Sequence, residues 1–177
     1  VQTCALPILP VTGATASTLS KDESDFGFKV FGGYQFTPNF GAEVGYVDLG
    51  KFGVTRNVTA PAVGSVIATI KGSGLFADLV GTMPLQDNFS LIGRLGAIFS
   101  ETKASAITTG AVTFPAGTNT SPKETETNFK LGFGAQYHIT NTIAVRAEWE
   151  RYLKLGKPNT TGEGDVDLFS LGLVFKF

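Results

Sequence analysis

Residues 25–47 read DFGFKVFGGYQFTPNFGAEVGYV, and apolar side chains recur at nearly every second position on both sides of a short break. A period of two is the period of a β-strand whose two faces meet different surroundings. The break, Thr37-Pro38-Asn39, is typical of a tight turn, because Pro38 presets its φ angle and Asn39 tolerates the less common backbone angles. The stretch therefore predicts an antiparallel β-hairpin.

The same hairpin unit recurs twice further along the chain, and one more strand follows it. The alternating segments are 25–36, 40–47, 75–83, 89–99, 129–137, 143–152 and 168–177. Short turns connect the two strands of each hairpin, whereas long loops rich in Thr, Gly, Asn, Ser and Pro connect the hairpins, at 48–71, 100–127 and 153–165. Short turns at one end and long loops at the other are typical of outer-membrane barrels. The sequence therefore predicts an all-β, antiparallel up-and-down transmembrane β-barrel.

The composition excludes several classes of protein. Of the 177 residues, 42% are hydrophobic and 16% are charged, and the formal net charge is -1, so neither disorder nor a basic surface for nucleic acid is indicated. One Cys (Cys4) and one His (His138) argue against a disulfide framework and a zinc site, and we expect no metal and no cofactor. No stretch is apolar enough for a membrane-spanning helix of roughly 20 residues.

The polar face of the strands distinguishes a membrane barrel from a soluble one, since both kinds alternate. It mixes charges of both signs with many glycines, which leave space for long side chains. Such a mixture suits a narrow interior in which opposite charges pair. The residues assigned to this ion-pair network are Lys29, Glu43, Asp78, Arg94, Lys130, Arg146, Glu148 and Glu150, with Lys176 on the same face.

The apolar face is almost free of charge and carries aromatic residues at both of its ends. Aromatic belts at the two edges of an apolar band are typical of a protein that crosses a membrane and meets lipid with that face. The aromatic residues assigned to the interfaces are Phe36, Phe40, Phe89 and Tyr137 beside the short turns, and Tyr46, Phe99 and Trp149 towards the long loops.

The seven recognisable strands are an odd number, whereas bacterial single-chain barrels have even numbers. If the short turns and Phe177 lie on one side of the membrane, a long loop and one more strand should precede residue 25. We assign residues 9–24 to that loop and residues 25–177 to the barrel domain. Residues 1–8, VQTCALPI, show no aromatic alternation, and we interpret them as a non-native start in place of a lost first strand.

Four segments together resemble the OmpA-like transmembrane domain family. They are GFKVFGGYQFTPNFGAEVGYVDLG (27–50), VGTMPLQDNFSLIGRLGA (80–97), VRAEWERY (145–152) and DVDLFSLGLVFKF (165–177). The resemblance implies an eight-stranded barrel integral to the bacterial outer membrane and in contact with its lipids. It also implies insertion by the outer-membrane barrel assembly machinery, for which Phe177 on the closing strand would serve as the assembly signal.

Two features of the sequence could suggest catalysis. His138 lies beside a short turn, away from the external rim where lipid-modifying barrels carry His/Ser-based sites, and we interpret it as a turn or interfacial residue. Glu148 and Glu150 share a strand face, yet the cations on that face favour ion pairs over acid–base chemistry. We therefore expect no catalytic residue.

The sequence thus predicts a non-enzymatic outer-membrane barrel that serves envelope integrity or surface contacts through long external loops. Its lumen should be plugged by ion pairs, because eight strands enclose only enough space for side chains. A small channel or carrier for apolar or small solutes is the alternative. A lipid-modifying enzyme and a soluble ligand-binding barrel are less favoured, and the sequence does not identify an external partner.

Overall fold

The computed structural model describes residues 16–22, 26–60, 63–86, 88–111, 113, 119–155 and 164–177. Within these ranges the chain forms eight β-strands. They are β1 (Ala16–Asp22), β2 (Phe28–Gln35), β3 (Phe40–Ala60), β4 (Gly64–Gln86), β5 (Phe89–Gly110), β6 (Lys123–His138), β7 (Ile143–Leu155) and β8 (Gly164–Phe175). No helix in the described part of the chain is long and apolar enough to cross a membrane.

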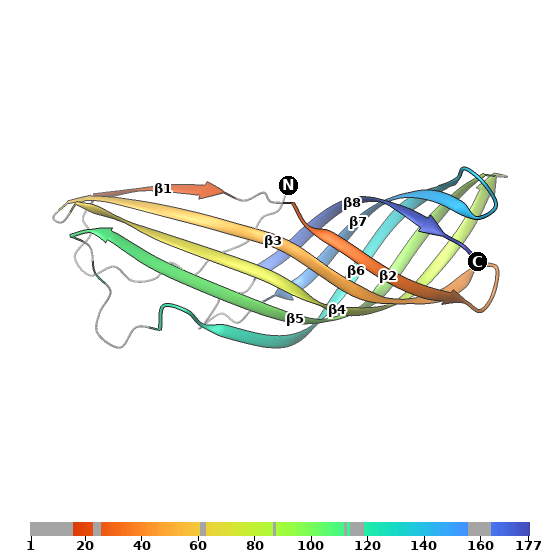
Figure 1. The fold of residues 1–177 in the computed structure, drawn as a ribbon, viewed down its shortest axis with the longest axis horizontal. Helices are drawn as coiled ribbons and strands as arrows, with labels where there is room; N and C mark the ends of the chain where they lie inside the picture. The colour runs from red at the N-terminus through yellow and green to blue at the C-terminus, as the bar shows by residue number, and fades with distance from the viewer. Residues whose placement is uncertain are drawn as a thin grey trace.

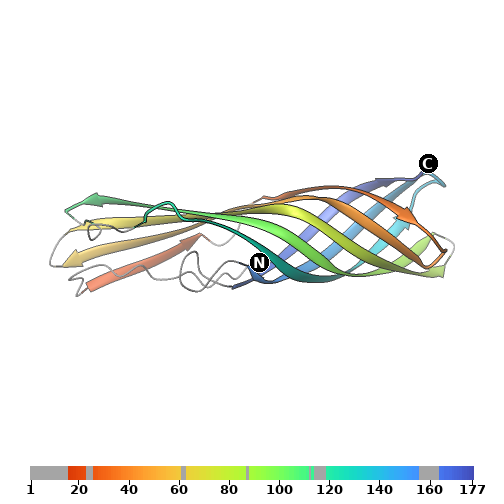
Figure 2. The same cartoon turned by 90° about the horizontal axis from the view of Figure 1, so that it is seen from below.

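The strands form one antiparallel sheet in which each strand from β2 to β8 pairs with the next along the chain. The turns that follow β2, β4 and β6 gather at the end of the sheet where the C-terminus lies (Figure 1). The predicted antiparallel up-and-down all-β architecture is confirmed. At this end the sheet curls around itself (Figure 2), so that it has a convex outer face and a concave interior.

At the other end of the sheet, β3, β4 and β5 continue as a long projecting extension (Figure 1). The prediction of long loops at 48–71 and 100–127 is therefore wrong over most of their length. These segments contain many Thr, Val and Ile residues, which favour strands, and a continuous ladder pairs them across β4 and β5. Their polarity suggested loops, but polar side chains do not prevent backbone pairing.

A strand also forms in the segment that we assigned to a loop at 9–24. This strand, β1, pairs with residues 53–60 of β3, while β2 pairs with residues 41–48 of the same β3 edge. The two short strands therefore lie one after the other along one long neighbour. The long edge of β3 gives the backbone of β1 its hydrogen-bond partners, so this strand does not depend on apolar alternation. Residues 1–15, including the proposed non-native start, lie outside the described residues.

The alternation sorts the side chains between the two faces of the curled sheet. Leu79, Leu95 and Leu131 lie directly opposite one another on β4, β5 and β6, and all three are exposed on the convex face. The side chains between them point into the concave interior. A sheet with an apolar outside and charged residues inside is the arrangement of a membrane barrel, which places any functional chemistry in the interior or on the extension.

The first and last positions of the curled sheet are β2 and β8. Because six successive antiparallel pairings separate them, these strands run in the same direction, as their arrowheads show (Figure 1). No backbone ladder joins β2 to β8 within the described residues.

Candidate functional site: the charged interior

Arg94 of β5 is the centre of the charged interior. Its guanidinium contacts carboxylates from three strands: Glu43 Oε2 of β3 at 2.8 Å, Asp78 Oδ2 of β4 at 3.1 Å and Glu150 Oε1 of β7 at 3.1 Å. It also pairs with Glu148. The Arg94 side chain is almost completely buried, so its charge is compensated by protein groups and not by water.

Two lysines continue this network on either side of Glu150. Lys130 Nζ lies 2.9 Å from Asp78 and 2.7 Å from Glu150. Lys29 Nζ lies 2.5 Å from Glu148 and 2.9 Å from Glu150. Lys29 belongs to β2 and both glutamates belong to β7, so these contacts cross the interior between the first strand of the curled sheet and the strand next to its last.

Arg146 of β7 completes the network. Its Nη1 lies 2.7 Å from Glu43 Oε1, and its Nε donates a hydrogen bond of 2.9 Å to Gln136. The eight residues that the sequence assigned to the network thus lie together, as four cations and four carboxylates in the described part of the chain. Lys176, the ninth charged residue on that face, follows the end of β8 and is exposed.

Glycines on neighbouring strands make room for these long side chains. Gly132 and Gly134 lie opposite Glu150 and Glu148, and an added Cβ would lie 3.0 and 2.9 Å from the Cγ atoms of these two glutamates. Gly96 lies opposite Asp78, and an added Cβ would lie 2.2 Å from the Asp78 carboxylate and from the backbone oxygen of Ala77. The charged side chains therefore occupy the space that these glycines leave free in the interior.

The substitution Gly96→Ala should lower the free energy of unfolding by about 1–3 kcal/mol, because the new methyl group must displace backbone or the Asp78 carboxylate. Urea unfolding of the protein in lipid vesicles would measure this. Gly93→Ala is the matched control, since Gly93 lies on the same strand and an added Cβ there has nothing within 4 Å. Equal effects of the two substitutions would contradict the assignment of Gly96 to the interior.

An apolar cluster, which we call the apolar cap, packs against the charged network on the side of the extension, and it was not predicted from the sequence. Lys130 Nζ lies 4.0 Å from the ring centroid of Phe76 and 5.2 Å from that of Tyr152, so the cap rests directly on the charged network. Strand parity could have identified both rings, because Phe76 lies between two lipid-facing residues and Tyr152 shares its face with Glu150. The cap consists of Val47, Leu49, Phe52, Phe76, Ile98, Tyr152, Leu155, Val166 and Leu168.

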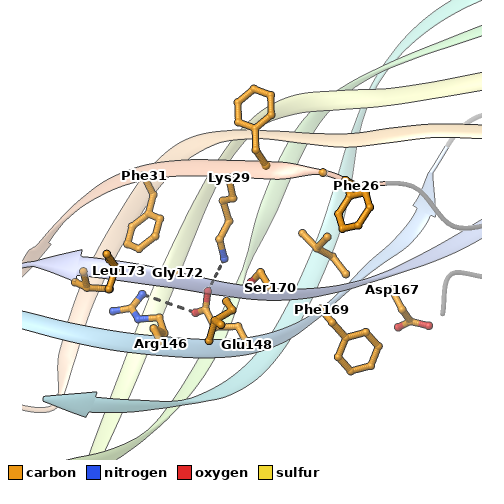
Figure 3. Close-up of a pocket in the computed structure, with 15 residues that line it drawn as sticks. Phe26, Lys29, Phe31, Arg146, Glu148, Asp167, Phe169, Ser170, Gly172 and Leu173 are labelled. Atoms are coloured by element: carbon orange, nitrogen blue, oxygen red, sulfur yellow. Dashed lines mark hydrogen bonds and ion pairs between the residues drawn. The ribbon is translucent and has the colours of Figure 1, made fainter. Parts of the chain in front are cut away.

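A cavity of about 660 Å³ lies between β2 and β8. Figure 3 shows Lys29 and Phe31 of β2 pointing across it towards Arg146 and Glu148 of β7, beneath Gly172 of β8. The cavity therefore connects the charged interior with the two facing edges of the sheet.

The remaining residues singled out by the sequence lie outside this network. Six of the seven aromatic residues assigned to the interfaces are exposed, and Trp149 is half-buried beside Phe133. His138 is the last residue of β6, and its Nε2 lies 3.2 Å from the amide nitrogen of Gln136. Phe177 is exposed beyond the end of β8. Among the described residues, no group of three or more His, Cys, Asp or Glu side chains is placed to hold a metal ion.

The chain is similar to known proteins in both sequence and structure. The sequence model of the OmpA-like transmembrane domain matches residues 10–177. Outer membrane protein A of Shigella flexneri is 29% identical over 94% of this chain, and that of Escherichia fergusonii is 31% identical over 88%. The chain spans 44% and 41% of the length of these two relatives. Among solved structures, Ail of Yersinia pestis is similar, with 19% identity, a TM-score of 0.48 and 91% of each chain covered.

Proposed function

The chain belongs to the OmpA-like transmembrane domain family and is an integral protein of the bacterial outer membrane, and on this premise we propose that it is a non-enzymatic barrel with a plugged lumen. Its role would be to support the envelope and to make surface contacts. The observation that carries the proposal is the ionic network, in which four buried cations and four buried carboxylates from six strands fill the interior.

The cost of opening such an interior supports this function. Each buried charge in the network contacts at least one opposite charge, and separating a buried pair leaves an uncompensated charge in a region of low dielectric. The apolar cap adds a second barrier, because Val47, Ile98 and Tyr152 are fully buried between the network and the extension. An ion would have to displace both layers to cross the membrane through the interior.

The protein inserted into a planar lipid bilayer is therefore expected to show no steady ionic conductance. The physical reason is that no continuous column of water can form while the network and the cap are both in place. Single-channel recording measures this, and heat-modifiable migration in SDS gels shows that the same preparation is folded. A steady conductance carried by folded protein would contradict a plugged lumen.

A small channel or carrier is the second candidate, and the cavity between β2 and β8 favours it. The cavity already reaches Lys29 and Arg146, so a path along the facing strand edges would avoid the apolar cap. If a conductance is recorded, Gly172→Trp should abolish it, because Gly172 lines the cavity and has open space around it.

Closure of the barrel is part of the proposal. An open sheet edge in hydrocarbon leaves backbone groups without hydrogen bonds, at a cost of several kcal/mol for each group. Since β2 and β8 run in the same direction, one further strand antiparallel to both would restore alternation around the barrel and give eight strands. We propose that such a strand fills the position beside the cavity.

We infer one kind of partner for each end of the barrel. At the end with the short turns, β8 alternates with apolar residues on its outer face and Phe177 follows it, which supports recognition of this segment by the outer-membrane barrel assembly machinery. At the other end, the extension of β3, β4 and β5 projects beyond the curled part of the sheet (Figure 1), and we assign surface contacts to it.

A further inference from the structure

Four lysines lie side by side across the extension, in the part that is nearest the apolar band. Lys51 is directly opposite Lys71, Lys71 is opposite Lys103, and Lys103 is opposite Lys123. These residues, which we call the lysine row, come from the four neighbouring strands β3, β4, β5 and β6, and all four are exposed.

The lysine row lies on the same face as the lipid-facing side chains. Lys71 and Lys103 are each four residues beyond an exposed apolar residue, Leu75 on β4 and Phe99 on β5, and no irregularity interrupts the ladder between them. An even number of residues keeps the same face of a strand. Four residues correspond to about 14 Å along the strand, so the row lies just past the aromatic end of the apolar band.

Two of the four lysines, Lys103 and Lys123, share a single carboxylate. Glu101 Oε1 lies 2.6 Å from Lys103 Nζ, and Glu101 Oε2 lies 2.7 Å from Lys123 Nζ. On β3, Asp48 lies nearer the apolar band than Lys51 does. Its carboxylate accepts a hydrogen bond of 2.8 Å from the backbone N–H of Gly50. Hydrogen bonds from Lys103 and Lys123 lower the pKa of Glu101, so this carboxylate is ionised at neutral pH.

The lysine row is unfavourable for the sheet alone, because like charges directly opposite one another destabilise a sheet. Lys103 and Lys123 remain 57% and 56% exposed although both contact Glu101, so their ammonium groups are open to a second anion. Neighbouring strands are about 4.8 Å apart, so the row of ammonium groups on four neighbouring strands is about 14 Å wide. This width suits a head group that carries more than one phosphate.

We propose that the lysine row binds the phosphates of a phosphorylated lipid head group in the outer leaflet of the membrane. The acyl chains of that lipid would lie against the apolar band below, beside Leu75 and Phe99. Long lysine side chains reach the interface in this way while their stems cover apolar surface. The inference rests on the proposed orientation, in which the extension faces outwards.

Native mass spectrometry of the full chain in detergent micelles would test the site, with bisphosphorylated lipid A as the probe. The wild-type protein should retain this lipid, and monophosphorylated lipid A should bind more weakly. Each lysine removed should weaken binding about fivefold, so that Lys71→Gln combined with Lys103→Gln gives a loss of roughly 25-fold. Lys71→Arg combined with Lys103→Arg should retain the lipid, because the charge is kept.

Two further variants separate lipid binding from a purely structural role. Lys154→Gln is the matched control, because Lys154 is an exposed lysine on β7, outside the row, and binding should not change. Glu101→Gln should tighten binding, because it removes the carboxylate that competes for Lys103 and Lys123. A row that only stabilises the sheet through Glu101 would instead give unchanged or weaker binding in this variant.

Several results would overturn the proposal. They are equal retention by the wild type and the double glutamine variant, an equal loss in Lys154→Gln, and displacement of the lipid by millimolar inorganic phosphate, which would indicate a site for free anions. Heat-modifiable migration of every variant is measured in parallel. A wild-type chain that fails to fold in micelles would contradict the proposed function, whereas folded protein without selective lipid retention would contradict the lysine row alone.

Discussion

Replacing Arg94 by Met is expected to lower the free energy of unfolding by roughly 3–5 kcal/mol, because it leaves buried carboxylates without their shared cation. Arg94 contacts four carboxylates, and two of them, Asp78 and Glu150, are fully buried. Methionine occupies a similar volume and carries no charge, so the loss of charge compensation dominates the effect. Urea unfolding in lipid vesicles, followed by the fluorescence of the single tryptophan, Trp149, measures the change.

Two controls separate charge balance from side-chain volume. Lys154→Met removes an exposed cation from β7 and should change the unfolding free energy little, because exposed charges contribute little to stability. Adding Glu43→Gln to Arg94→Met restores an equal number of cations and carboxylates and should recover part of the loss. If the double variant is less stable than Arg94→Met, charge balance does not organise the interior.

The fold class could be predicted from the sequence because a period of two leaves little freedom. Once seven segments alternate, their faces follow, and the convex face of the structure carries the residues that the alternation assigned to it. The lengths of the strands could not be predicted in the same way. β3, β4 and β5 extend well beyond the apolar alternation, since backbone pairing between neighbours continues where the side chains become polar.

The composition of the interior could be read from strand parity, but its pairing could not. The contacts of Lys29 with Glu148 and Glu150 join residues about 120 positions apart in sequence, so they depend on how the sheet curls. The apolar cap was missed for a different reason. The alternation was used to assign apolar residues to lipid, and Phe76 and Tyr152 are apolar residues on the opposite face.

The lysine row could not be predicted from the sequence either, because only the pairing register of the strands brings the four lysines together. Lys51 and Lys71 lie in one segment that was assigned to a loop, and Lys103 and Lys123 lie in another. Nothing in their spacing along the chain shows that four strands bring them to one level. A correct assignment of the extension to paired strands would have been needed first.

Replacing Leu95 by Arg should destabilise the inserted protein by about 2–4 kcal/mol, the cost of placing an arginine at the middle of the bilayer. Leu95 is 63% exposed on the convex face, and it lies near the middle of the apolar band on β5, whose ends are Phe89 and Phe99. The measurement is the unfolding free energy in lipid vesicles. The yield of heat-modifiable protein on refolding gives a second readout, and it should fall as well.

The matched control is Ile107→Arg, which introduces the same side chain on the same face of the same strand. Ile107 is 55% exposed, but it lies on the extension, twelve residues beyond Leu95, so its cost should be about 0–1 kcal/mol. Both substitutions replace an exposed aliphatic side chain by arginine, and their main difference is the position along β5 and therefore the medium around the side chain. If Leu95→Arg and Ile107→Arg have equal effects in vesicles, the convex face at Leu95 is not surrounded by lipid, and the outward orientation of the apolar face is wrong.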